Sequence, residues 1–533
     1  MNYGSRAVRC AASAFALFAA MTSSIGHADV LTTNSQVEAE KPGSRYVQCD
    51  GYPNNMTAGE SAARLLGAVT LLALFAPPPE SADTSKRKFG ADGVAVCTGL
   101  LEGETREGHP DRRMGLILAR AAHHIEAKNY DAALADIAMA RGEAEAAGLM
   151  ADHYWARSRG RSFDQIEAAA LFRQGKAAEA QAILLRQVPT LKHSAWEFAT
   201  TRDFAFALPE ASEAELQSLG WAVRSGYLLG KQANRLDEIG RFAESARLHD
   251  ALIAYQQNLG LEVRPSLPIA HAALAHALAG NAAVAAERAA EARRNFEARK
   301  SAGKPEDNAA AFVEVMDLYG IVTTANGGDA RTARRLFAAR SEWVAASFGS
   351  VLEVNRRLRT GAPADDLIGG LARDPKQLWD ARAEAARAEM LAKDSDNKTL
   401  FFLIDGIVPA NVYEGMSKMV WRTDKSRLVI KPGKNKRSND EVMALFGYTW
   451  PATMDAYAMH AALLARSRGH QGFVIMPIVT EKYVAASFKT GNRGDAGLPD
   501  AMFNDANEVI ADMSALFPDE AALKARRAAK TAR

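Results

Sequence analysis

Two stretches of the chain differ in the spacing of their apolar residues. From Ala58 to about Lys393, alanine and leucine recur at the three- and four-residue spacing of amphipathic helices. After Lys398, short runs rich in Val, Ile, Phe and Tyr appear between helical stretches. We therefore expect a mainly α protein, with a helical region followed by a small α+β region.

Five places in the helical region share one local pattern, a turn followed by a small residue three or four positions later. The Gly or Asn of the turn tolerates positive φ, and the small residue lets the second helix approach the first closely. The five patterns are KNYDAA (Lys128–Ala133), QGKAAEA (Gln174–Ala180), IGRFAES (Ile239–Ser245), AGNAAVA (Ala279–Ala285) and NGGDARTA (Asn326–Ala333). Because a helical run stands on both sides of each pattern, the sequence predicts five helical hairpins.

These patterns resemble tetratricopeptide repeats. Tyr130 with Ala133, and Phe242 with Ser245, match the aromatic-x-x-small turn signature of that family. The small residues that match its first helix are Ala121, Ala168, Ala233 and Ala273. The pieces GVAVCTGLLEG and ARAAHHIEAKNYDAALADI look like the opening of exported bacterial proteins of this kind.

The resemblance covers about Gly93 to Ala345 and departs from the family in its spacing. The family repeats every 34 residues or so, whereas the matching small residues here are spaced more widely and unevenly. The widest step contains an insertion, Leu191–Gln217, and Ile321 stands where a small residue is expected in the last unit. The resemblance implies an α-solenoid of helical hairpins over residues 93–393.

A solenoid of this family binds its ligands in a groove lined by the first helices of the repeats. The groove positions carried over from the family are polar in the middle units: Ser162, Gln165, Arg173, Tyr227, Asn234, Asp237 and Glu238. Those in the other units are mainly apolar: Leu118, Ile125, Leu274, Val315 and Leu318. Such a groove suits an extended peptide or a helix of a protein partner. The alternative is that the insertion and added helices fill it.

The N-terminal segment has the features of a secretory signal peptide over residues 1–28. Arg6 and Arg9 precede a short apolar core, and small residues end at Ala28, the expected cleavage point. The mature protein is then expected in the periplasm or outside the cell. The whole chain has 65 basic and 63 acidic residues, so losing two arginines leaves no net charge, which argues against a dedicated nucleic-acid binder.

Residues 29–92 are expected to form an N-terminal strap with one packing helix. The apolar run Leu65–Ala76 is too short for a bilayer span of about 20 residues, so we expect no membrane-spanning helix in the mature chain. Cys49 and Cys97 remain after cleavage, and export favours a disulfide between them. It would tie the strap to the first helix of the solenoid, and the alternative is two buried thiols.

The C-terminal region, residues 398–518, is expected to be a small α+β domain. Its predicted strands are TLFFLIDGIVP, a hairpin in SKMVWRTDKSRLVIKPG, GFVIMPIVT and KYVAASFKTG. Helices are predicted in ATMDAYAMHAALLARSRGH and DAMFNDANEVIADMSALFP, with helices on one side of a largely antiparallel sheet. Residues 519–533 form a basic tail.

No pattern in the sequence carries a recognisable catalytic or metal site. His123 and His124 point about 100° apart on a helix and do not chelate one ion together, so His123 is expected at the surface or in the groove. The tripeptides of penicillin-recognising enzymes occur in SKRK, SDN and KTG, but Ser85 lies in a charged loop where the family needs a buried helix. Asp405 fits a turn aspartate as well as a catalytic one.

The sequence therefore favours a non-enzymatic protein-binding scaffold of the cell envelope, without catalytic residues, metal or cofactor. Two alternatives stay open. One is an envelope enzyme whose active site lies in the C-terminal domain, and the other is an accessory factor of a membrane assembly or secretion complex.

Overall fold

The structure is a computed structural model, and the residues that it describes are mainly helical. The structure describes residues 43–54, 80–103, 106–193, 208–226, 229–258, 265–303, 308–340, 342–394, 399–404, 410–423, 441–445, 450–479 and 484–531. The expected signal peptide and the expected packing helix at Leu65–Ala76 lie outside these residues, as do Tyr227 and Asp405. None of the described helices has the length and apolarity needed to span a membrane.

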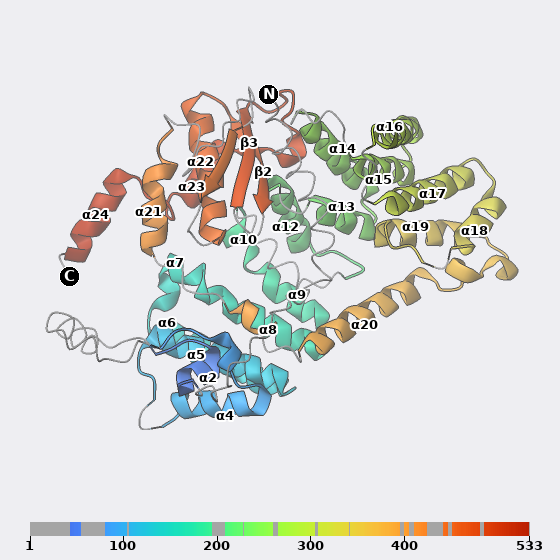
Figure 1. Ribbon diagram of the computed structural model, residues 1–533. Helices are drawn as coiled ribbons and strands as arrows, with labels where there is room; N and C mark the ends of the chain where they lie inside the picture. The colour runs from blue at the N-terminus through green and yellow to red at the C-terminus, as the bar shows by residue number, and fades with distance from the viewer. Residues whose placement is uncertain are drawn as a thin grey trace, which may run out of the picture.

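All five predicted hairpins are present, and helices packed in sequence confirm the expected fold class (Figure 1). They are α5 (Pro110–Glu126) with α6 (Tyr130–Ala146), α8 (Arg159–Arg173) with α9 (Ala177–Leu185), α13 (Leu229–Glu238) with α14 (Phe242–Asn258), α15 (Ser266–Leu278) with α16 (Ala282–Ser301), and α17 (Ala309–Asn326) with α18 (Ala330–Ala338). We number them one to five in this order.

The five turns share one backbone geometry. The residue two positions before each second helix has a positive φ, and in four hairpins this residue is glycine: Gly175, Gly240, Gly280 and Gly328. In the first hairpin it is Lys128, with φ of 61°, whereas Asn129, the turn residue that the sequence suggested, has φ of −93°. A left-handed residue here ends the first helix and lets the chain reverse.

The predicted contact residues are buried between the paired helices. Ala133, Ala180, Ser245, Ala285 and Ala333 are all at most 1% exposed. Because these positions admit only small side chains, the helices approach closely, and the apolar clusters of the hairpins form around them. The local pattern therefore predicted both the turns and the contacts.

The N-terminal strap is joined by a disulfide to the helix that precedes the first hairpin. Helix α2 (Arg45–Asp50) is followed by the 3₁₀ turn η2 (Thr84–Lys86) and helix α4 (Gly90–Leu101). Cys49 on α2 is bonded to Cys97 on α4, with their Cα atoms 5.0 Å apart. The expected disulfide is confirmed, and it ties the strap to the helix that packs against α5.

The C-terminal sheet has the order β1-β3-β2-β4, and all its strands are antiparallel. The strands are β1 (Glu441–Leu445), β2 (Gly472–Val479), β3 (Val484–Gly491) and the two-residue β4 (Asn504–Asp505). Helices α21 (Ala410–Val420), α22 (Trp450–Ser467), α23 (Ala506–Met513) and α24 (Glu520–Thr531) accompany it, and the 3₁₀ turn η7 (Asp500–Met502) precedes β4.

Alternation along β2 places the sheet between two groups of helices. Phe473 and Ile475 pack with α22 on one face, whereas Val474 and Met476 pack on the other with residues of α12 (Glu213–Arg224), α13 and α14. A strand with apolar residues on both sides is buried on both faces. The sheet therefore docks onto the middle of the helical region, beside the third hairpin (Figure 1).

Two of the predicted strands are wrong. Phe401–Leu403 forms a short 3₁₀ turn, η6, and the start of the predicted hairpin, Ser417–Val420, belongs to helix α21. Tyr413, Met416 and Val420 of α21 are buried in the core around α22. Their spacing of three and four residues is that of a helix face, which overrides the β-branched composition of the segment.

Candidate functional site: the inner face of the hairpins

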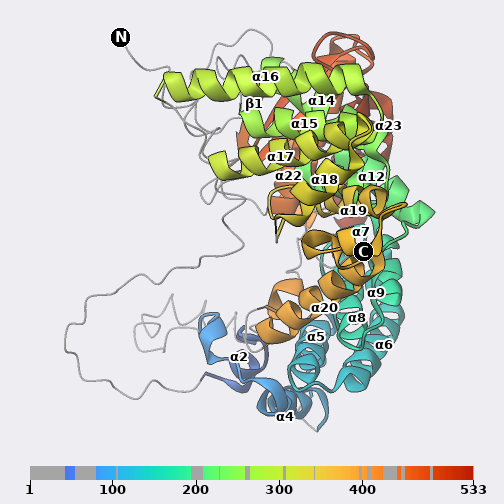
Figure 2. The ribbon, with the colours of Figure 1, turned by 90° about the vertical axis from the view of Figure 1, so that its right-hand side faces the viewer.

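The candidate site is the inner face, which we define as the side of the stack formed by the first helices α5, α8, α13, α15 and α17. The chain crosses this face after the fifth hairpin. We call residues 339–404 the return segment; it contains α19 (Phe348–Arg359), the 3₁₀ turns η4 (Ala364–Asp366) and η5 (Gly369–Leu371), α20 (Pro375–Lys393) and η6. In both views α20 runs from the region of α19 to that of α8 and α9 (Figures 1 and 2).

Helix α19 is packed tightly on the third, fourth and fifth hairpins. Asp237 Oδ2 on α13 accepts hydrogen bonds from the hydroxyls of Ser347 and Ser350, at 2.6 and 3.3 Å. Glu314 Oε1 on α17 accepts from the backbone N–H groups that lead into α19, those of Ala345 and Ala346. These acidic side chains of the inner face therefore hold the N-terminal end of α19, where unpaired N–H groups favour negative charge.

A close backbone approach completes this contact. A Cβ atom added at Gly349 would lie 2.2 Å from the Asp237 carbonyl carbon, so only glycine fits where α19 crosses α13. At the other end of α19, Arg357 Nη2 donates to the Leu278 carbonyl oxygen, 2.6 Å away, at the C-terminus of α15. Helix α19 is therefore held by hydrogen bonds to α13, α15 and α17, in the position where a bound partner helix is expected.

Helix α20 is held at its middle and just beyond its C-terminal end. Arg382 Nη1 donates to Glu238 Oε1 at 2.6 Å, and its guanidinium also lies over the Phe348 and Trp379 rings. Beyond the C-terminal end, Asp394 accepts from Arg173 Nε and Nη2, at 2.6 and 2.5 Å. Arg387 donates to the Arg173 carbonyl oxygen.

The end of the return segment covers the first two hairpins. Phe401 packs against the His123 ring, with the centroids 5.0 Å apart, and the Arg87 guanidinium lies over the Phe401 ring, 3.9 Å from its centroid. With the Gln165 amide oriented so that both of its groups are bonded, its nitrogen donates to the Leu403 carbonyl oxygen at 2.7 Å. The return segment therefore contacts all five first helices.

The predicted groove residues do lie on this face, but they do not line an open groove. Ser162, Gln165, Arg173 and Asp237 are at most 4% exposed, and the five apolar positions predicted with them are buried as well. The Glu238 side chain is 6% exposed, while Asn234 is exposed. Of the two alternatives that the sequence left open, the structure shows the filled groove, because the return segment occupies it, and sequence periodicity does not report where a later helix docks.

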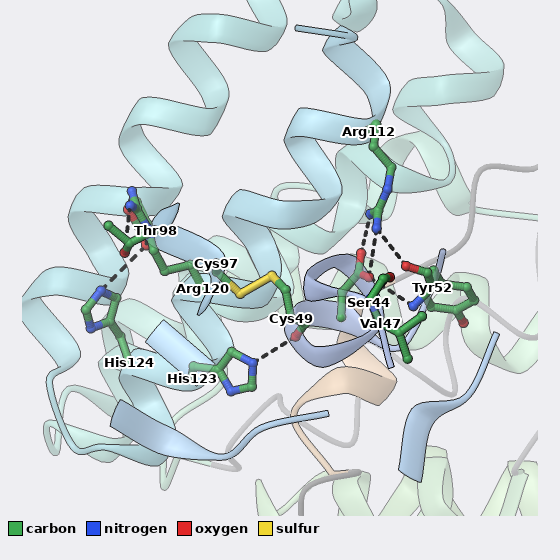
Figure 3. The surroundings of a disulfide bond; sticks show 12 residues. Ser44, Val47, Cys49, Tyr52, Cys97, Thr98, Arg112, Arg120, His123 and His124 are labelled. Carbon is green, nitrogen blue, oxygen red and sulfur yellow. Dashed lines mark hydrogen bonds and ion pairs between the residues drawn. A yellow bond between two sulfur atoms is a disulfide. The ribbon is translucent and has the colours of Figure 1, made fainter. Parts of the chain in front are cut away.

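The position of His123 also differs from the one predicted from the sequence. It is fully buried, and the expectation of a surface or groove position is wrong. Its Nε2 lies 2.9 Å from the Cys49 carbonyl oxygen, beside the disulfide (Figure 3), and its Nδ1 lies 2.8 Å from Glu126 Oε2. A Cβ at Gly93 would lie 2.4 Å from His123 Nδ1, so the glycine makes room for the ring. This histidine anchors the strap on α5.

Sequence reasoning missed two clusters of titratable side chains, one on the inner face and one next to it. Burial raises the pKa of Asp237 to about 6, although the hydroxyls around it act in the opposite direction. The His249 and His271 rings are stacked with centroids 5.8 Å apart, and burial lowers their pKa values to about 3 and about 4. Nothing in the spacing of these residues signals the clusters, because each joins different hairpins or segments.

One set of possible metal ligands occurs among the described residues. Donor atoms of His193, Glu508 and Asp512 lie within 4.8 Å of one another. However, Lys192 Nζ is already 2.5 Å from Asp512 Oδ2 and 3.6 Å from Glu508 Oε1. The ammonium balances these carboxylates, so the set acts as an ion-pair cluster that fastens the end of α10 (Val188–Leu191) to α23.

A pocket of about 440 Å³ lies between the turn of the third hairpin, the end of α15 and α19. Phe242 and Leu278 form part of its apolar wall, and Arg356 and Arg357 of its polar wall. Both guanidiniums donate to Glu353, which also lines the pocket. An anion would have to compete with this carboxylate.

No family model, curated protein or solved structure matches the chain.

Proposed function

We propose that the protein is a non-enzymatic binding scaffold of the bacterial cell envelope, related to tetratricopeptide-repeat proteins, that holds a protein partner at the inner face. The observation that carries the proposal is the binding of the return segment by that face. Side chains of the inner face form hydrogen bonds with the N-terminal end of α19, with backbone N–H groups and with a carboxylate, all of them in the return segment. These are the contacts by which such a face recognises a partner helix.

Two further observations support this proposal. The three most exposed large hydrophobic side chains of the described residues are Val344, Phe402 and Ile368, at 80%, 72% and 61%, and all belong to the return segment. A partner at the inner face would cover some of them, as the apolar centre of an interface requires. The Cys49–Cys97 disulfide supports export to an oxidising compartment.

A site-specific crosslinking experiment tests the function. Asn234 is an exposed residue of a first helix, and Glu287 is an exposed residue of α16, on the opposite side of its hairpin. A photo-crosslinking amino acid at position 234 should capture a defined envelope protein in intact cells, whereas the same group at position 287 should not. Equal capture at both positions, or none at either, contradicts binding at the inner face.

The proposed location has a separate test. Mass spectrometry of the protein purified from the envelope fraction should give an N-terminus at Asp29. A chain that retains Met1 would exclude both cleavage and the envelope location built on it.

A further inference from the structure

Helices α19 and α20 are attached to the inner face to very different degrees. The buried residues of α19 are Gly349, Ser350, Leu352, Val354, Asn355 and Leu358. Helix α20, although longer, has no buried residue. Because burial of apolar surface dominates helix docking, α19 is an integral part of the stack, whereas α20 is held mainly by its polar anchors.

The two ion pairs that hold α20 determine which charges a replacement helix on the inner face must carry. The Arg173 side chain is 1% exposed and forms an ion pair with the Asp394 carboxylate. The Glu238 side chain is 6% exposed and forms ion pairs with both Arg382 and Arg235. Without α20, Arg173 would be a buried guanidinium lacking a carboxylate, which is costly unless another acid replaces Asp394. The vacated face would therefore select a segment with the same charges.

The spacing of these charges is fixed by helix geometry. Arg382 and Asp394 are twelve residues apart, which is about 18 Å along a helix axis. Between them, Met390 packs against the apolar cluster of Leu171, Phe172 and Leu184. A competing helix therefore needs a cation, an apolar residue about two turns later, and a carboxylate one turn beyond that.

We propose that α20 is a displaceable occupant of the second and third hairpins, and that the partner of this part of the inner face is a helix with that arrangement of cation, apolar residue and carboxylate. This inference rests on the proposed function and specifies its partner. Displacement costs little buried surface, and the partner restores both ion pairs, so binding exchanges one helix for another of the same kind.

The test uses the full-length protein and a synthetic peptide of residues 374–394. The variant Arg382→Glu/Asp394→Lys breaks both ion pairs that hold α20 on the inner face but leaves Arg173 and Glu238 unchanged. An intramolecular occupant competes at an effective concentration of roughly millimolar, so we expect the labelled peptide to bind the variant at least about tenfold more tightly than the parent. A peptide with the two charges exchanged should not bind the variant.

Equal binding to parent and variant, or equal binding of both peptides, overturns the inference. If the variant does not fold, hydrogen exchange on the parent decides: amides of α20 should exchange about tenfold faster or more than those of α19, because α20 opens locally. Equal protection of the two helices overturns the inference. A partner captured at position 234 together with a negative peptide result would refute this mode of recognition and leave the proposed function standing.

Discussion

Arg157 and Asp455 lie 298 positions apart in the chain and form a two-point ion pair, with N···O distances of 3.0 and 2.9 Å. The Asp455 carboxylate is fully buried and also accepts from the Tyr413 hydroxyl at 3.2 Å. Arg157 follows the short helix α7 (His153–Ala156), whereas Asp455 belongs to α22. The pair therefore fixes the C-terminal region to the first half of the helical region.

The first prediction concerns this pair. Asp455→Ala should lower the free energy of unfolding by about 3 to 5 kcal/mol, because it removes the buried carboxylate that pairs with the Arg157 guanidinium and accepts from the Tyr413 hydroxyl. Urea denaturation followed by tryptophan fluorescence measures the loss. Adding Arg157→Met to Asp455→Ala should recover part of it. Full stability of the single variant would contradict the buried pair.

The disulfide gives the second prediction. Cys49 and Cys97 are separated by 48 positions, and closing a loop of that length stabilises a fold by about 4 kcal/mol on the chain-entropy model. The Cys49→Ala/Cys97→Ala variant should unfold at a lower temperature by calorimetry, and reductant should lower the transition of the parent but not that of the variant. If thiol reagent labels both cysteines of the denatured, unreduced parent, the disulfide is absent.

The third prediction compares two turns of the same geometry. Lys128 has φ of 61° where the other hairpins have glycine, and a left-handed L-residue costs roughly 1 kcal/mol or more. Lys128→Gly should therefore raise the free energy of unfolding by about 1 kcal/mol. The matched change Gly175→Ala should lower it by a similar amount, since an added Cβ there meets no atom within 4 Å and only backbone strain is introduced. Effects of the same sign would contradict the shared turn geometry.

The fourth prediction is a pH dependence at Asp237. Its pKa is raised to about 6 in the folded protein, so the folded state binds more protons than the unfolded state between about pH 4 and 6. This contribution to stability is present at low pH and is lost as the pH rises through 6. The parent should therefore lose about 2 to 3 kcal/mol of unfolding free energy between pH 4 and pH 7 that the Asp237→Asn variant does not lose. Denaturation at both pH values measures the gap, and an equal difference at the two would contradict the raised pKa.

The fifth prediction, at His249 and His271, has the opposite sign. Their pKa values are lowered in the folded protein, so the unfolded state binds more protons between about pH 4 and 6.5, and stability falls as the pH drops through this range. Among the charged neighbours, Asp250 and Glu314 oppose this shift, and His276 adds to it at His249. The His249→Phe/His271→Phe variant should retain the stacked rings. Its melting temperature should fall less between pH 7 and pH 5 than that of the parent. A parallel loss would contradict the lowered pKa values of the two histidines.

The helical hairpins and the disulfide could be predicted from the amino-acid sequence alone. A turn with a left-handed residue, a small residue at a fixed offset and apolar spacing on either side are local signals, so KNYDAA and its four counterparts predicted the turns and the buried contacts of Ala133 and Ala180. Strands β2 and β3 were predicted for the same reason, since their apolar runs lie between clear breaks. The disulfide followed from the presence of only two cysteines after the expected signal peptide.

The contacts of the inner face could not be predicted in this way, because they join segments that are far apart in the chain. Arg173 and Asp394 are 221 positions apart, and Asp237 and Ser347 are 110 apart. Each of these residues looks like an ordinary polar residue in its own segment. No periodicity within one element records that a later helix lies across it, so the sequence could not decide between an open and a filled groove. His123 was misplaced for a similar reason, because its burial comes from the strap, Gly93 and Phe401, three segments brought together only by the fold.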